Sequence, residues 1–314
     1  MRRVIVVGAG VSGLTTAVTL QEAGYAVTIY TQDLPGATTS AVAAAIWFPY
    51  AVAPVHAANR WSAESYRVFE QLAQTPATGV SMTDFLVLTR PGIDNSWREE
   101  LPEGAARLAK AKELPPGYEM GYLAKVPLAE TPVYLPYLQS RFMKAGGLFQ
   151  QATVHHLTDL ARETDLLVNC AGLGARELCQ DESVYPIRGQ VVKVENVPGT
   201  RSMVDSMDKG KLAYVIQRGK DTILGGTDYE HDYNNTTSPE DTQIILRRCA
   251  QLQPSLTQPK LINAAAGLRP KRPAIRCEQE PGQPIFHNYG HGGAGFTVSW
   301  GCAGEILKII RGLS

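Results

Sequence analysis

The hydrophobic pattern at the start of the chain predicts a strand, a helix and a second strand. Val4 to Val7 are apolar without interruption, as in a strand buried on both faces. From Val11 the apolar residues follow helical spacing until Gly24, and Ala26 to Tyr30 has the composition of a second strand. Together these elements form a βαβ unit.

A glycine-rich turn joins the first strand to the helix. It reads Gly8-Ala9-Gly10-Val11-Ser12-Gly13. Its three glycines suit a tight turn, close approach of the backbone to a pyrophosphate, and close packing of helix on strand. The helix N-terminus also presents N–H groups and the positive end of its dipole to an anion. The turn therefore predicts a dinucleotide site, and the alternative is a glycine-rich turn that binds no ligand.

An acidic residue is expected near the end of the second strand, where a carboxylate accepts hydrogen bonds from ribose hydroxyls. Here that place is occupied by Gln32 and Asp33. This pair disfavours NADP and does not separate FAD from NAD.

The pattern of the remaining chain predicts further helices and strands. Thr38 to Trp47 is rich in small residues. Such a segment can lie close to a large ligand, and the alternative is a plain alanine-rich helix. The expected helices are 59–74 and 135–145, with a third that begins at Ser238 as N-cap. The expected strands are 85–89, 148–154, 166–169, 189–195, 212–217 and 222–224. The small residues Ala171 and Gly172 end one of these strands, at a place where a cofactor commonly lies against a parallel sheet.

A second glycine cluster lies near the C-terminus. A strand over 285–289 is followed by a turn over 290–297 and a helix over 298–311. Such a turn can press its backbone against a planar ring, while the helix N-terminus supports negative charge on a reduced flavin. Upstream, the proline-stiffened segment 267–273 carries Arg269, whose guanidinium can hold a carboxylate with two hydrogen bonds. A surface basic patch is the alternative, and it suits Lys271 and Arg272 better than Arg269.

Composition and charge narrow the function further. The chain has 314 residues, and 30 basic residues balance 30 acidic ones, which gives no indication of a nucleic-acid or membrane partner. Its five cysteines are irregularly spaced, so neither a disulfide framework nor a zinc site is expected. Because the first strand begins at the N-terminus, we expect no signal peptide and a cytoplasmic protein. The oligomeric state stays open, with a homodimer as the assembly to test.

Seven segments carry a resemblance to the D-amino-acid oxidase family, which includes the D-aspartate oxidases. They run in family order from end to end of the chain and cover residues 7–14, 38–47, 168–172, 189–190, 224–226, 267–270 and 287–293. The last, His287-Asn288-Tyr289-Gly290-His291-Gly292-Gly293, is the most specific.

The resemblance implies an α/β fold, with a Rossmann-like FAD-binding domain and an inserted, mainly antiparallel β substrate domain. We assign residues 1–50, 135–188 and 262–314 to the first domain, and 51–134 and 189–261 to the second. FAD is the implied cofactor, and a D-amino acid and oxygen are the implied substrates. The residues expected at the FAD are Gly8, Ala9, Gly10, Val11, Ser12, Gly13, Gln32, Asp33, Thr39, Ser40, Ala44, Ala45, Ile46, Val154, Ala171, Gly172, Gly292, Gly293, Ala294, Gly295, Phe296 and Thr297.

The resemblance also implies a mechanism and a substrate class. Arg269 and the hydroxyl of Tyr214 would hold the substrate carboxylate, and the carbonyl of Gly293 would accept a hydrogen bond from its amine, so that hydride passes from Cα to flavin N5. The extra cations of D-aspartate oxidases are replaced by Met207 and Asp228. We therefore expect neutral, and also basic, D-amino acids as substrates rather than D-aspartate.

Several alternatives remain. A D-aspartate oxidase, or a glycine oxidase or another FAD amine oxidase, is the nearest enzyme. An NAD(P)H-dependent flavoprotein reductase would require a second nucleotide fingerprint, which the sequence lacks. A flavin-binding protein without catalytic activity is the third class.

Overall fold

The computed structural model describes residues 1–49 and 52–312 in two compact units. Unit 1 comprises Met1–Val80, Ala129–Pro186 and Arg269–Ser314, and unit 2 comprises Ser81–Leu128 and Ile187–Leu268. The domain boundary that we place between residues 50 and 51 lies outside the described residues. The structure has the α/β fold that the sequence predicts. Among the described helices, none has the length and apolar character needed to cross a bilayer.

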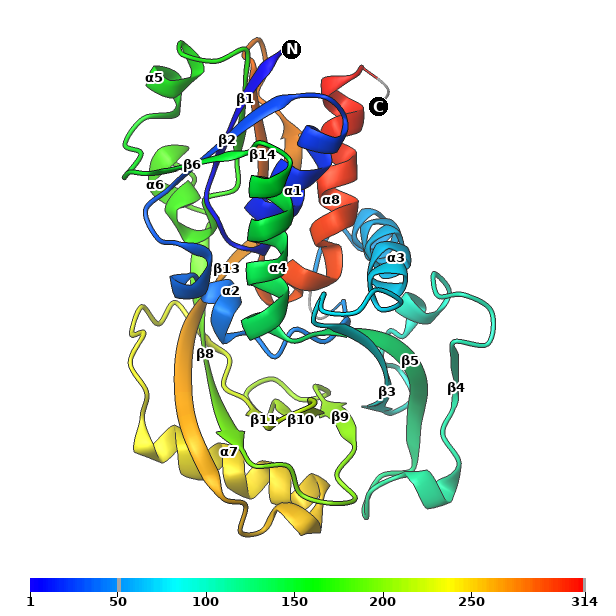
Figure 1. The fold of residues 1–314 in the computed structure, drawn as a ribbon. Helices are drawn as coiled ribbons and strands as arrows, with labels where there is room; N and C mark the ends of the chain where they lie inside the picture. The colour runs from blue at the N-terminus through cyan, green and yellow to red at the C-terminus, as the bar shows by residue number, and fades with distance from the viewer. Residues whose placement is uncertain (50–51, 313–314) are drawn as a thin grey trace. The chain divides into compact units, whose positions relative to one another are not determined.

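A parallel sheet with helices on both faces forms the centre of unit 1 (Figure 1). Its strands run in the order β14-β7-β1-β2-β6, and β13 lies antiparallel beside β14. The strands are β1 (Arg3–Val7), β2 (Ala26–Thr31), β6 (Leu148–Gln151), β7 (Leu166–Asn169), β13 (Leu261–Gln279) and β14 (Ile285–His291). The helices are α1 (Val11–Glu22), α2 (Thr39–Val42), α3 (Val55–Leu72), α4 (Thr131–Lys144), α5 (Leu157–Ala161), α6 (Ala175–Leu178) and α8 (Gly295–Ile310).

Strand β1 is apolar at every position because both of its faces are covered. Val4 and Val6 pack into the cluster formed with α1, α4 and α8, which lie side by side in Figure 1. Ile5 and Val7 point to the opposite face, where they pack with Leu157 of α5 and Leu178 of α6. Parallel strands end at one edge of a sheet, so the residues after β1, β2, β6, β7 and β14 share the carboxyl edge of unit 1.

Helix α3 belongs to unit 1, although the domain assignment from the sequence placed its residues in the second domain. A Cβ at Gly301 of α8 would lie 2.2 Å from the carbonyl oxygen of Trp61, and the Gly301 N–H donates to the Ser65 hydroxyl at 2.9 Å. This close contact holds α3 on α8. The amphipathic pattern of α3 predicted its apolar face but could not say which element covers that face. The domain boundaries themselves stay a prediction.

Unit 2 is built on a mainly antiparallel sheet, as predicted. Its order is β4-β5-β3-β9-β10-β11-β8, with β12 paired to β8, and β3 with β9 is a parallel pair. The strands are β3 (Val80–Thr89), β4 (Ala106–Leu108), β5 (Met120–Ala129), β8 (Tyr185–Val194), β9 (Ser202–Asp205), β10 (Ala213–Gln217), β11 (Thr222–Gly225) and β12 (Tyr229–Glu230). The pattern did not predict β4, β5, β9 or β12, which are short or lie in the proline-spotted region before residue 134.

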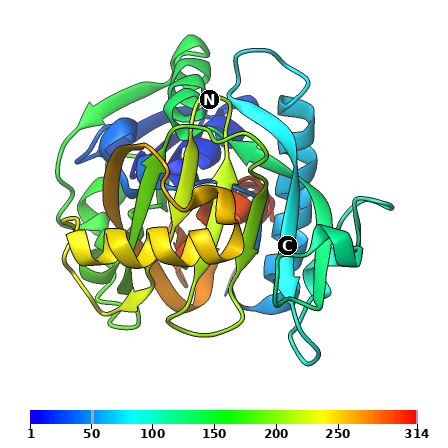
Figure 2. The same cartoon turned by 90° about the horizontal axis from the view of Figure 1, so that it is seen from below.

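One helix, α7 (Pro239–Leu252), lies across the unit 2 sheet (Figure 2). Ile245, Cys249 and Leu252 pack on strand residues that include Leu224. The predicted N-cap is confirmed, because the Ser238 hydroxyl accepts the Asp241 N–H at 3.1 Å.

Strand β13 contains the segment that carries Arg269. The residues up to Leu268 belong to unit 2, and those from Arg269 onward belong to unit 1. Its pairing with β14 is irregular between Lys271 and Arg276. The proline-stiffened segment is therefore part of a strand rather than a separate loop.

Candidate functional site

Each glycine of the first turn is required by a close contact. Gly8 has a φ of +106°, and a Cβ there would lie 2.5 Å from the carbonyl oxygen of Cys170. At Gly10 a Cβ would lie 3.1 Å from the Ser40 hydroxyl, and at Gly13 it would lie 1.9 Å from the carbonyl oxygen of Gly8. The turn thus lies tightly against its neighbours and leaves no room for side chains at Gly8 and Gly13, while a side chain at Gly10 would require the Ser40 hydroxyl to move. A tight turn of this kind is the shape expected of a pyrophosphate site.

Residues 39–48 form a mostly irregular segment beside this turn. Helix α2 covers only Thr39–Val42, so the alternative of a plain alanine-rich helix is wrong. The Ser40 hydroxyl accepts the Val11 N–H, the first of α1, at 2.9 Å. Ala45 has a φ of 56°, and its carbonyl oxygen accepts the Ala129 N–H at 3.0 Å. The segment therefore lies beside the start of α1, which it contacts through the short side chain of Ser40.

The second glycine turn is shorter than the sequence predicted. Strand β14 continues to His291, Gly292–Ala294 form a single 3₁₀ turn, and α8 already begins at Gly295. Gly292 has a φ of 55°, while Gly293 is exposed. A Cβ at Gly295 would lie 3.8 Å from Cγ1 of Val11. The N-terminal ends of α1 and α8 therefore meet, and their dipoles add positive potential at one place.

A buried chain of polar groups connects the two glycine turns. Asn288 donates through Nδ2 to the Thr16 hydroxyl at 3.0 Å, and its Oδ1 lies 2.9 Å from Nε2 of His291. The Cys170 thiol lies 3.7 Å from the same Thr16 hydroxyl. Burial lowers the pKa of His291 to about 4, so its ring is neutral at pH 7 and donates through Nε2. The sequence pattern did not predict these hydrogen bonds. The polar side chains that lie within otherwise apolar elements were the one sign that buried hydrogen bonds exist there.

The other residues expected at the FAD lie mostly at the carboxyl edge of the sheet. Gln32 and Asp33 follow β2 and are exposed, and Gln151 Nε2 donates to the Gln32 carbonyl at 3.2 Å. Val154 follows β6 and packs beside Ile5 and Val7. Ala171 and Gly172 follow β7, with a φ of 59° at Gly172.

Three expected residues in α8 and the turn before it have side chains engaged elsewhere. Ala294 is buried, and the ring of Phe296 packs in the core near Tyr134. The Thr297 hydroxyl accepts the Phe48 N–H at 3.1 Å and donates to the Phe48 carbonyl at 3.0 Å. At these positions the backbone, rather than the side chain, is the part that can face a ligand.

The three residues proposed for the substrate are positioned by strands and by the second turn. Arg269 is a half-buried residue of β13, and Gly293 belongs to the exposed part of the second turn. Tyr214 lies on β10 in unit 2, where a Cβ at Gly225 would lie 2.0 Å from its Cζ. The two glycines at 225 and 226 therefore make room for the Tyr214 ring. Their joint role stays a prediction.

Arg272 belongs to a network and not to a surface patch. Its Nε donates to Asp181 Oδ2 at 2.8 Å, and the Tyr289 hydroxyl donates to the same oxygen at 2.8 Å. Arg276 continues the network to Tyr289 at 3.1 Å and to Glu280 at 2.7 Å. This network holds β13 and β14 to the segment after α6.

The carboxyl of Asp181 makes this network sensitive to acid. Burial alone would raise its pKa, but hydrogen bonds from Ser183, Tyr289 and Arg272 outweigh burial and lower the pKa to about 2. An unfolded chain takes up this proton near pH ~3.9. As the pH falls below that value the unfolded state binds more protons, so the free energy of unfolding decreases.

We expect Asp181→Asn to remove this pH-dependent contribution to the free energy of unfolding. The wild type should lose more free energy of unfolding between pH 5 and pH 3 than the variant does, measured by urea unfolding at both values. Asp159→Asn is the matched control, because Asp159 is 63% exposed and pairs only loosely with Arg162 at 3.8 Å. Equal losses in wild type and Asp181→Asn would contradict the expectation.

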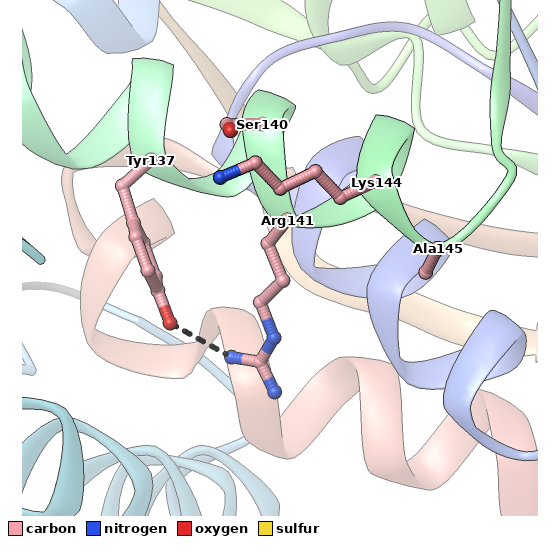
Figure 3. Close-up of a pocket in the computed structure, with 5 residues that line it drawn as sticks. All are labelled: Tyr137, Ser140, Arg141, Lys144 and Ala145. Carbon is pink, nitrogen blue, oxygen red and sulfur yellow. Dashed lines mark hydrogen bonds between the residues drawn. The ribbon is translucent and has the colours of Figure 1, made fainter.

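A surface hollow over α4 lies away from this site (Figure 3). It is lined by Tyr137, Ser140, Arg141, Lys144 and Ala145. Helix α4 ends just before β6 begins, so the hollow lies towards the amino ends of the strands. Arg141 there pairs with Glu22 at 2.9 Å, which is a structural contact between α4 and α1.

Comparison with known proteins agrees with the geometry at the carboxyl edge. A model of the family described as FAD dependent oxidoreductase matches residues 3–308. This chain belongs to that family.

Two relatives of this FAD-dependent oxidoreductase match it over nearly all of their lengths. The D-amino-acid oxidase of Rubrobacter xylanophilus is 42% identical over 312 residues, with 98% of this chain and 95% of the relative covered. The D-amino-acid oxidase of Streptomyces coelicolor is 41% identical over 315 residues, with 98% and 96% covered. Among solved structures, glycine oxidase from Bacillus cereus has a TM-score of 0.82 at 20% identity, with 100% and 98% covered, which shows a shared fold.

The described residues fit the FAD that this family uses. A side chain at Gly10 would crowd the Ser40 hydroxyl, so glycine keeps the backbone of the turn accessible, and the N-termini of two helices meet beside it. At the second turn the backbone of Gly293 is exposed. Both glycine turns predicted to hold the cofactor lie in unit 1, in segments from opposite ends of the chain.

Proposed function

We propose that this protein is a D-amino-acid oxidase that acts on neutral, and also basic, D-amino acids. The balanced reaction converts a D-amino acid, oxygen and water into a 2-oxo acid, ammonia and hydrogen peroxide. The observation that carries the proposal is the 42% identity to a D-amino-acid oxidase over 98% of this chain. Identity and coverage of this size support a fold shared from end to end.

Binding and orientation are the work of the protein in this proposal. The guanidinium of Arg269 takes the substrate carboxylate with two parallel hydrogen bonds, because its planar fork matches a carboxylate. The Gly293 carbonyl accepts a hydrogen bond from the amine, and the Tyr214 hydroxyl is the predicted second partner of the carboxylate. These contacts fix two substituents of Cα, the carboxylate and the amine, and the requirement that the Cα–H face the flavin fixes the third, so the two enantiomers are distinguished.

The cofactor residues hold the nucleotide and the ring at two places. The turn at residues 8–13 and the Ser40 hydroxyl would hold the pyrophosphate, and Gln32 or Asp33 the ribose. The backbone of residues 292–295 would support the ring. When bound, FAD accepts the hydride from the substrate Cα and transfers two electrons to oxygen.

Unit 2 supports the preference for substrates without a side-chain carboxylate. Met207 carries no charge, and it packs against the apolar cluster of this unit. The Asp228 carboxylate accepts the Gly210 N–H at 3.4 Å, and its negative charge disfavours a second carboxylate nearby. Tolerance of basic side chains follows from the same charge.

Anaerobic mixing with an amino-acid panel tests the proposal. We expect D-alanine and D-valine to bleach the flavin absorbance, D-lysine to do so more slowly, and D-aspartate and L-alanine to have little effect. Fastest bleaching by D-aspartate or by glycine would instead indicate a D-aspartate oxidase or a glycine oxidase. Yellow protein that no D-amino acid bleaches would contradict the proposal, and bleaching by NADH alone would indicate a reductase.

The state of the cysteines bears on the cellular compartment. We infer a cytoplasmic protein, because all five cysteines, which lie within the described residues, are free thiols, as in a reducing compartment. A homodimer stays a prediction, to be measured by light scattering.

A further inference from the structure

The side chain of Lys271 lies across the second glycine turn. Lys271 pairs with His291, the last residue of β14 before that turn. A Cβ at Gly292 would lie 3.0 Å from Cδ of Lys271 and 4.0 Å from its Nζ. The residue is half-buried, so its stem packs on the turn and its ammonium lies at the turn.

Lys271 and Arg269 share one face of β13, and the neighbouring residues face the other way. The Cγ of Pro270 lies 3.7 Å from a Cβ at Gly172, and Arg272 packs on Gly290 and pairs with Asp181. Side chains alternate along a strand, so residues 269 and 271, two positions apart, lie on the same face. Lys271 is thus directed to the side of the strand that meets the second turn.

Three sources of positive potential therefore converge at residues 292–295. They are the N-terminus of α8, the adjacent N-terminus of α1 and the ammonium of Lys271. A flavin gains negative charge on reduction, and charge near the ring shifts its reduction potential. We propose that the Lys271 ammonium, held across Gly292, supplies positive charge to the isoalloxazine ring of bound FAD and favours its reduced form.

Sulfite affinity and reduction potential test this role without any substrate. Sulfite adds to flavin N5 and leaves negative charge on the ring, so its Kd reports the local potential. In Lys271→Met, which keeps an unbranched stem on Gly292, we expect the sulfite Kd to rise about tenfold. We expect the potential of bound FAD to fall by ~30 mV, the equivalent of a tenfold change for two electrons.

Two controls separate charge from packing. Lys271→Arg keeps the charge and should restore both values to within about twofold of the wild type. Lys144→Met removes a lysine from the exposed surface of α4 and should change neither value. FAD-containing Lys271→Met with an unchanged sulfite Kd and an unchanged potential would overturn the proposal.

Loss of FAD in the variants is also informative. If Lys271→Met and Lys271→Gln both lose FAD while Lys271→Arg retains it, the charge requirement is supported. Loss from all three would overturn the proposal, because the lysine would then act through its shape. The inference requires FAD but no particular amine, so a failure of the D-amino-acid panel would leave this test intact.

Discussion

Arg269→Leu is expected to lower kcat/KM for D-alanine by about 10³-fold or more while FAD stays bound. The substitution removes both hydrogen bonds to the substrate carboxylate and leaves that charge without a partner. Removing one member of such a charged pair costs on the order of 2–5 kcal/mol, and about 4 kcal/mol corresponds to 10³-fold. Initial rates of peroxide production across D-alanine concentrations measure the effect.

Two further variants make the Arg269 result specific. Arg269→Lys keeps a charge but not the planar fork, so it should fall between the wild type and Arg269→Leu. Arg162→Leu removes an arginine that is 82% exposed and should leave kcat/KM within about twofold of the wild type. Activity of Arg269→Leu within tenfold of the wild type would rule out Arg269 as the carboxylate ligand.

Gly13→Ala is expected to weaken FAD binding strongly. The new Cβ would lie 1.9 Å from the Gly8 carbonyl oxygen, a backbone atom that cannot rotate away. Either α1 moves off the turn or the turn itself opens, and both changes destroy the pyrophosphate cradle. We expect FAD to bind at least about 100-fold more weakly, measured by titration of the apoprotein with FAD and flavin fluorescence.

Gly36→Ala is the matched control for this variant. A Cβ at Gly36 would meet no other atom of the described chain within 4 Å. It should therefore bind FAD like the wild type. Yellow, FAD-saturated Gly13→Ala protein would show that the turn does not hold the cofactor.

The sequence predicted the first cradle well because its signals are local. Consecutive apolar residues, three glycines and a helical period specify β1, the turn and α1 with little help from the rest of the chain. The N-cap at Ser238 was predictable for the same reason. The start of α8 was placed three residues late, because Gly295, Phe296 and Thr297 resemble a loop while tertiary contacts hold them in a helix.

Long-range contacts could not be predicted from the pattern. Three contacts illustrate this. The packing of α3 on α8 and the hydrogen bond from Asn288 to Thr16 join residues that are distant in sequence. The contact of Lys271 with Gly292 depends on the irregular pairing of β13 with β14. No periodicity encodes which polar side chain meets which. Family resemblance indicated residues 287–293 as a group but not the reason for each one.

The bond between Asn288 and Thr16 has a consequence for biogenesis. These residues are 272 positions apart, so residue 288 must leave the ribosome before the two glycine turns can join. FAD capture is therefore expected only after that point of synthesis, and until then the emerging polypeptide gains no stabilisation by mass action from FAD.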